Sequence, residues 1–133
     1  MPRGMMGGVR DTPYLVVDEP LLEANLAAMA FHARQRGLAL RPHAKTHKTP
    51  EIARRQLAHG AVGLTVATVG EAEVFADAGF DDLFIAYPVW AEGPRAQRLH
   101  DLARRVRLRV GADSVAAVGM LARAAAGDGQ PVS

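Results

Sequence analysis

The segment GLTVATVGEAEVFADAGFDDLFIAYPV, residues 63–89, decides the fold because it carries a complete strand–helix–strand unit. Apolar runs predict one strand over Val62–Val66 and the next over Leu83–Ala86. Between them the pattern predicts a helix over Glu71–Ala78, which Gly79 ends. Two strands joined by a helix in this way are typical of a parallel βαβ crossover.

The same alternation extends on both sides of this unit. Further helices are predicted over Pro20–Arg36, Pro50–Gly60, Gly93–Arg105 and Ser114–Ala126. Further strands are predicted over Leu38–Lys45 and Val106–Val110. The strands begin roughly 20 to 25 residues apart, so the sequence predicts an α/β fold with a parallel sheet and about four strand–helix units.

The alternation of side chains within the predicted strands distinguishes between two parallel folds. In Val106–Val110 the apolar residues share one face, and Arg107 and Arg109 share the other. A central strand of an open doubly wound sheet is covered by helices on both faces, whereas a barrel strand keeps one lumen face. The pattern therefore favours a partial (β/α)8 TIM-type barrel. A solvated edge strand is the alternative interpretation of the two arginines.

The composition is that of one globular domain. The chain has 133 residues, of which 49% are hydrophobic and 23% charged. It has no cysteine, which excludes disulfides, cysteine nucleophiles and zinc knuckles. The sequence contains neither a signal-peptide pattern nor an apolar stretch near 18 residues, so we expect a cytoplasmic protein with no membrane contact.

The basic residues are distributed unevenly between arginine and lysine. The formal net charge of +2 does not by itself indicate nucleic-acid binding. Arg95, Arg98, Arg104 and Arg105 are interpreted as a solvated helix face, with RNA binding as a remote alternative. Of the 16 lysines and arginines, only Lys45 and Lys48 are lysines. In so arginine-rich a chain, a retained lysine indicates a need for an amine, because arginine cannot form an imine.

Both lysines lie in RPHAKTHKTP, residues 41–50, where a predicted strand ends and a helix begins. In barrels this end of the strands is the catalytic face. On the strand pattern, Arg41, His43 and Lys45 share the lumen face. An amine placed there can capture an aldehyde as a Schiff base. A solvated surface charge is the alternative interpretation of a lysine at such a position.

The segment RPHAKTHKTPEIARRQ, residues 41–56, resembles the D-threonine aldolase and D-serine dehydratase group of the alanine racemase N-terminal-domain superfamily. DTPYLVVD at residues 11–18 and the segment 63–89 are similar to the same group, in the same order. These enzymes are fold type III pyridoxal-phosphate enzymes. The resemblance implies that Lys45 forms the Schiff base with pyridoxal 5'-phosphate and that a small D-3-hydroxy amino acid is the substrate.

Other site residues are predicted with a structural alternative for each. His43 either orients the cofactor or packs as a hydrogen-bonded core histidine. Arg41 pairs with a carboxylate or with a group linked to the cofactor. Thr49 lies at a helix N-terminus, where it either meets the cofactor phosphate or serves as an N-cap. Tyr87 either stacks near the cofactor or packs against the protein.

Residues beside this set are assigned more weakly. His47 acts in proton transfer or caps a helix, and Lys48 is a second cation near the phosphate or a surface amine. Thr68 and Glu71 line the site or cap a helix. His43 and His47 have H-x-x-x-H spacing, but they straddle a strand end, so we expect no metal there. The resemblance implies a divalent metal in full-length members, bound by a C-terminal β domain that this chain lacks.

The predicted function is that of a lyase that cleaves or dehydrates D-3-hydroxy amino acids. An amino-acid racemase of the same superfamily and a non-catalytic pyridoxal-phosphate-binding fragment are the alternatives. We expect residues 1–10 to be a flexible N-terminus. Residues 11–133 are expected to form the N-terminal half of an alanine racemase-like barrel domain, with Gln130–Ser133 beginning a fifth strand. Such an incomplete barrel is expected to self-associate and to turn over substrate poorly.

Overall fold

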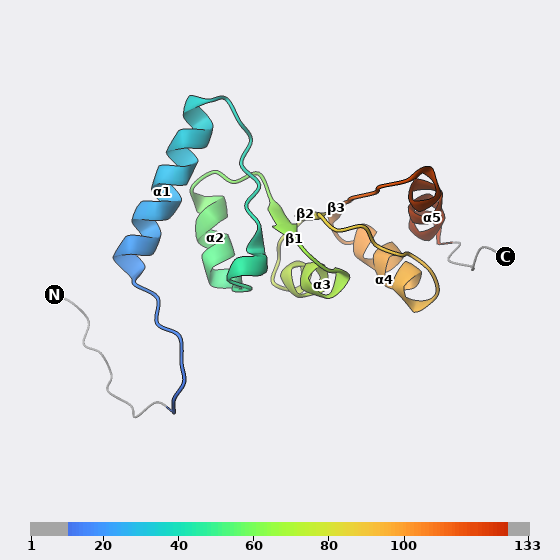
Figure 1. The fold of residues 1–133 in the computed structure, drawn as a ribbon, viewed down its shortest axis with the longest axis horizontal. Coiled ribbons are helices and arrows are strands. Elements are labelled where there is room, and N and C mark those ends of the chain that lie inside the picture. Colours follow the sequence, from blue (N-terminus) through green and yellow to red (C-terminus); the bar gives the residue numbers. More distant parts are fainter. Residues whose placement is uncertain (1–10, 128–133) are drawn as a thin grey trace.

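Helices and strands alternate along the chain in the computed structural model, which describes residues 11–127 (Figure 1). The predictions for residues 1–10 and for Gln130–Ser133 lie outside the described residues. The elements, in chain order, are α1 Glu19–Gln35, the 3-10 helix η1 Ala44–Thr46, α2 Pro50–Ala58, β1 Leu64–Val66, α3 Val69–Asp77, β2 Asp82–Ile85, α4 Pro94–Ala103, β3 Arg107–Val110 and α5 Val115–Ala126.

The three strands form one parallel sheet in the order β1-β2-β3. Leu64, Leu83 and Leu108 are aligned across it, and one residue later Thr65 pairs with Phe84. Helix α3 connects β1 to β2 and α4 connects β2 to β3, as parallel pairing requires. The predicted parallel α/β organisation is therefore confirmed.

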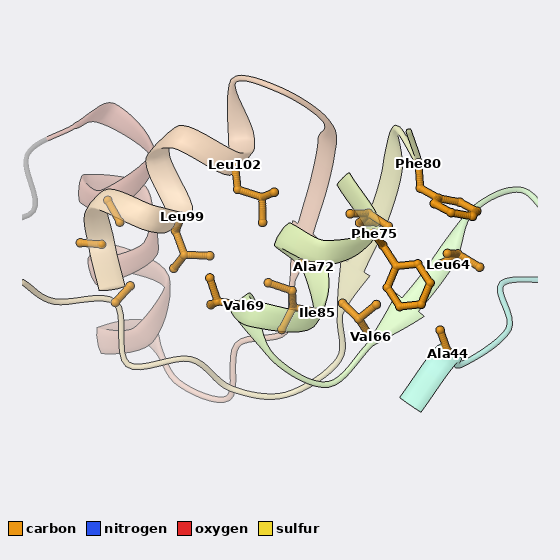
Figure 2. Close-up of a cluster of buried hydrophobic side chains, with 14 of the residues drawn as sticks. Ala44, Leu64, Val66, Val69, Ala72, Phe75, Phe80, Ile85, Leu99 and Leu102 are labelled. Atoms are coloured by element: carbon orange, nitrogen blue, oxygen red, sulfur yellow. The ribbon is translucent and has the colours of Figure 1, made fainter. Parts of the chain in front are cut away.

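The core lies between the sheet and the helices on one of its faces. Alternate strand residues such as Leu64, Val66 and Ile85 are fully buried there (Figure 2). Phe75 of α3 meets Phe80 edge to face, with ring centroids 5.4 Å apart. Burying each of these large side chains contributes about 2 kcal/mol to stability. The buried cluster continues along the molecule through Leu99 and Leu102 of α4 and Met120 and Ala124 of α5.

The opposite face of the sheet is polar. Arg109 alternates with the partly buried Leu108 and Val110 and aligns with Phe84 and Thr65 across the sheet. Arg109 bonds to Asp82 of β2 rather than pointing into the helix layer. The arginines of β3 therefore lie on the face that helices do not cover, as the alternation predicts. Both are exposed and β3 is an edge strand of the described sheet, so the alternative of a solvated edge strand also fits.

The predicted strand over Leu38–Lys45 is wrong in its extent. Residues 38–43 run beside β1, but the only bridge is between His43 and Thr65. Pro42 has no amide hydrogen to donate, although its carbonyl accepts from the amide of Thr65 at 2.8 Å. The chain then turns through η1 because the imidazole of His43 accepts the amide hydrogen of Lys45. Lys45 therefore lies in a 3-10 turn and not on a strand.

Helix α1 lies beside α2 (Figure 1), and charged side chains link the two helices. Arg55 lies 2.6 Å from a carboxylate oxygen of Glu19 and 2.7 Å from one of Glu23. His59 adds a contact of 2.8 Å to the other oxygen of Glu23. The hydrogen bond to His59, followed by the one from Arg55, lowers the pKa of Glu23 against the effect of burial. Among residues 11–127, none of the helices has the length and apolarity needed to cross a bilayer.

Candidate active site

The candidate site is built on residues 43–48, named here the HAKTHK loop. His43 pairs with Thr65 of β1, and the chain then leaves the sheet through η1 and enters α2 at Pro50. The loop therefore lies beyond the carboxyl end of the sheet, next to the turn from β1 to α3. In parallel α/β folds this edge is where ligands bind.

Two imidazoles clamp the backbone of the HAKTHK loop. Nδ1 of His43 accepts the amide hydrogen of Lys45 at 3.2 Å, and Nδ1 of His47 accepts that of Thr49 at 3.0 Å. Nε2 of His47 lies 3.3 Å from Oε1 of Gln56 on α2. Burial lowers the pKa of His47, although the bonds to Gln56 and Thr49 oppose this shift. The lowered pKa favours the neutral form of His47, and the ring joins the loop to α2.

The two lysines of the loop differ in their contacts. Nζ of Lys48 lies 3.3 Å from Oε1 of Glu71, whereas no hydrogen bond or ion pair within residues 11–127 involves Nζ of Lys45. The side chain of Lys45 is exposed. The structure therefore presents one uncommitted amine and one committed amine three residues apart.

Lys48 has a left-handed backbone conformation, with φ of +50°. This conformation costs a residue with a Cβ roughly 1–2 kcal/mol. The amide of Lys48 donates to the carbonyl of Ala44 at 2.8 Å, which closes the turn around Lys45. The geometry of the turn and the ion pair to Glu71 together offset the backbone strain.

Glu71 joins the HAKTHK loop to the β1–α3 turn. Its Oε2 accepts the amide hydrogen of Ala67 at 2.7 Å, and its own amide donates to Oγ1 of Thr68 at 3.0 Å. Thr68 is thus the N-cap of α3, which confirms the capping interpretation of Thr68, whereas Glu71 binds the amide of the residue before the cap and also contacts Lys48 of the loop. Burial raises the pKa of Glu71, but the Ala67 amide and the Lys48 ammonium outweigh it, so the pKa lies below its ordinary value.

Thr49 occupies the N-cap position of α2, but its side chain does not cap the helix. The hydroxyl donates instead to the carbonyl of His47 at 2.6 Å. Its predicted contact with a cofactor phosphate stays a prediction. Thr49 lies next to the HAKTHK loop, at the residue before α2.

Arg41 lies away from the loop, at the amino end of the sheet. Its Nη1 is 2.7 Å from Oδ1 of Asp82, the first residue of β2, and 3.3 Å from the carbonyl oxygen of Asp82. Arg107 and Arg109 reach the same carboxylate at 3.4 and 2.5 Å. The hydrogen bond from Arg41, with a further one from Arg109, lowers the pKa of Asp82 against the effect of burial. The predicted cofactor contact of Arg41 stays a prediction.

Tyr87 borders a separate cavity of about 300 Å³ between the β1–α3 turn and the segment after β2. Thr68, Gly70, Trp90 and Arg95 also line this cavity. Tyr87 is exposed, and its predicted role beside the cofactor is likewise untested. The structure thus groups Lys45, His43 and Thr49, places Tyr87 beside the neighbouring turn, and places Arg41 at the other end of the sheet.

Two parts of this arrangement are missing from the sequence reasoning. Asp82 was not singled out, because it lies just before the predicted strand Leu83–Ala86; its parity with Phe84 is the signal for a partner of the arginines on that face. The pairing of Lys48 with Glu71 was also missed. Lys48 and Glu71 each follow the end of one of two neighbouring strand segments. This placement is the signal from which their contact could have been predicted.

The chain belongs to the family described as "Alanine racemase, N-terminal domain", whose profile matches residues 17–133. Its fold is therefore part of the TIM-barrel-like domain of that family, as predicted. A D-threonine aldolase of Arthrobacter sp. is 48% identical over 105 residues, which are 78% of this chain and 27% of the relative. A D-threo-3-hydroxyaspartate dehydratase of Delftia sp. is 41% identical over 113 residues, or 84% of this chain and 29% of the relative.

A solved structure gives the same relationship in three dimensions. The D-threonine aldolase from Filomicrobium marinum superposes with a TM-score of 0.83 at 41% identity. The match covers 92% of this chain and 33% of that protein. The chain thus spans a third or less of the length of each of these relatives.

Proposed function

We propose that this chain carries the cofactor-binding lysine of a pyridoxal-phosphate lyase that acts on D-3-hydroxy amino acids. The observation that carries the proposal is the uncommitted amine of Lys45 beyond the carboxyl end of a parallel sheet. Lys48, the other lysine of the chain, is held by Glu71. Lys45 is therefore the amine available to an aldehyde.

The donor chemistry of the loop fits pyridoxal phosphate. When bound, this cofactor supplies an electron sink for charge that develops at the substrate Cα. Nδ1 of His43 accepts a backbone hydrogen, so the neutral ring carries its proton on Nε2. His43 is proposed to orient the cofactor through that proton, and Thr49 is proposed to lie near its phosphate.

The substrate class follows from the relatives. Threonine and 3-hydroxyaspartate, which their names specify, are both amino acids with a hydroxyl group on C3. Breaking the Cα–Cβ bond would give glycine and an aldehyde, and loss of the hydroxyl would give a keto acid and ammonia. A divalent metal near that hydroxyl is part of the proposal for the full-length family. No set of three or more His, Asp or Glu side chains in residues 11–127 could hold one, so we derive no step through a metal.

Reductive trapping tests the assignment of the lysine. The chain is incubated with pyridoxal phosphate, reduced with borohydride and mapped by peptide mass spectrometry. We expect the label on Lys45, its loss in Lys45→Ala, and its retention on Lys45 in Lys48→Ala. Label that falls mainly on Lys48 would reject the assignment, and label on neither lysine would reject the proposed function.

Incubation with D-threonine and D-serine tests the reaction. An aldehyde supports an aldolase and a keto acid supports a dehydratase, whereas an L-amino acid would favour a racemase. We expect slow turnover from the chain alone, because the described residues supply the lysine loop and no cluster for a metal. Cofactor capture with no product at all would favour a non-catalytic binding role. Turnover at an ordinary rate, on the order of 1 to 1000 per second, would show that these residues suffice.

A further inference from the structure

We propose that Glu71 is a positioning residue that selects Lys45 over Lys48 as the amine available to the cofactor. This inference rests on the proposed function. It arises from the contrast between two lysines of one loop, one of which is ion-paired at 3.3 Å while the other has no partner within the described residues.

Glu71 is well placed to hold Lys48. Its side chain is only 16% exposed, against 68% for Lys48, so the carboxylate is the fixed partner and the lysine is the mobile one. The hydrogen bond of 2.7 Å from the amide of Ala67 fixes the second carboxylate oxygen. Its backbone is in the first turn of α3, capped by Thr68. Two hydrogen bonds thus anchor Glu71 apart from its contact with Lys48.

The backbone of Lys48 gives an independent reason to assign a role to its side chain. A residue with φ of +50° is a position where glycine or asparagine would be less strained. The turn could therefore close without a lysine. The ammonium group contributes what glycine cannot, which is an ionic link between the HAKTHK loop and the β1–α3 turn.

The consequence is a division of roles within the loop. The ion pair directs the ammonium group of Lys48 toward α3. It also holds the turn that the amide of Lys48 closes onto Ala44, the residue before Lys45. Without the carboxylate, Lys48 is released and competes for the same aldehyde.

The test measures how the trapped label divides between Lys45 and Lys48. In Glu71→Gln, whose amide oxygen can still accept from Ala67, we expect the share on Lys48 to rise roughly two- to fivefold, as expected for the loss of an exposed ion pair. Glu73→Gln is the matched control, since Glu73 is on the same helix and pairs with Arg98 instead. Unfolding would expose both lysines to the reagent alike, so circular dichroism first establishes that each variant is folded.

A second arm uses the unmodified chain and so does not depend on the folding of a variant. Raising the salt concentration screens the ion pair, and the share on Lys48 should rise in the parent but not in Glu71→Gln. If the share of label on Lys48 is the same in the parent, in Glu71→Gln and at high salt, the proposed role of Glu71 is overturned while the proposed function stands. An unlabelled parent chain would overturn both.

Discussion

Arg41 and Asp82, which lie 41 positions apart in the sequence, are joined by a hydrogen bond of 2.7 Å between Nη1 and Oδ1. This contact fixes the extended segment before the HAKTHK loop to β2, across the amino end of the sheet. The carboxylate adds a side-chain link to the backbone hydrogen bonds from Val62 to Leu40 and from Thr65 to Pro42, which hold the same segment beside β1. Arg107 and Arg109 converge on the same group from β3.

Asp82→Asn is expected to lower the free energy of unfolding by about 2–3 kcal/mol, because a hydrogen-bonded carboxylate shared by several guanidinium groups is lost. The lowered pKa of Asp82 also makes the stability of the fold depend on pH in the acid range. The stability it contributes is present above the pKa of an unfolded aspartate, about 3.9, and is lost as pH falls through the lower folded value. Chemical denaturation between pH 7 and pH 3 measures both effects.

The control for this prediction is Asp77→Asn, which removes an exposed ion pair to Arg105 on the helix face. We expect it to cost less than about 1 kcal/mol. Similar losses in the two variants would show that Asp82 has no special part in holding the sheet.

The half-buried ring of His47 predicts a second dependence of stability on pH, in the range near neutral pH. Its folded pKa lies below the unfolded value of about 6.5, so the stability from the neutral ring is full above that value. This stability is lost as pH falls from the unfolded pKa toward the lower folded pKa of His47. The difference in unfolding free energy between the parent and His47→Gln should therefore shrink from pH 8 to pH 5. His32→Gln, at an exposed position of α1, should follow the parent at every pH.

Gly63 lies where the extended segment crosses β1, and it has no room for a side chain. A Cβ there would be 2.3 Å from Nη1 of Arg41 and 2.6 Å from the backbone oxygen of Asp82. Gly63→Ala is expected to cost about 3 kcal/mol through overpacking. Gly79→Ala, at φ of +92° with nothing within 4 Å, should cost only about 1 kcal/mol of backbone strain. Thermal or chemical unfolding of the two variants compares them, and equal losses would contradict the steric argument.

Self-association is predicted from an apolar cavity of about 370 Å³ between α4, β3 and α5, lined by residues that include Leu108 and Val118. Since Val118 is exposed at its rim, Val118→Lys should reduce concentration-dependent light scattering. Val115→Lys is the matched control, because Val115 is also exposed on α5 but does not line this cavity. Scattering that is independent of concentration in the parent chain would refute the prediction.

The order of elements could be predicted because the local signals agree with one another. Glycines such as Gly79 follow helix ends, and Val66 and Ile85 belong to apolar runs of strand length. The alternation in β3 gave the correct faces, since side chains on a strand have a strict period of two. These signals are local, and tertiary packing does not override them here.

The details of the candidate site were less accessible from the sequence. The strand predicted through Lys45 ends early because the His43 side chain competes for a backbone hydrogen, which a pattern of apolar residues does not reveal. The partner of Arg41 depends on the register between β1 and β2. The pairing of Lys48 depends on a left-handed backbone angle that lysine rarely adopts.

The imidazole acceptors of the HAKTHK loop make two of its amides unusual. The amides of Lys45 and Thr49 each donate to the ring two positions earlier, so protonation of that ring removes the acceptor. Solvent then exchanges the amide hydrogen freely. In an isotope-labelled sample, each amide resonance therefore reports the ionisation of one histidine, without a cofactor, a substrate or an attached dye. The loop that carries the reactive amine also carries its own spectroscopic sensors.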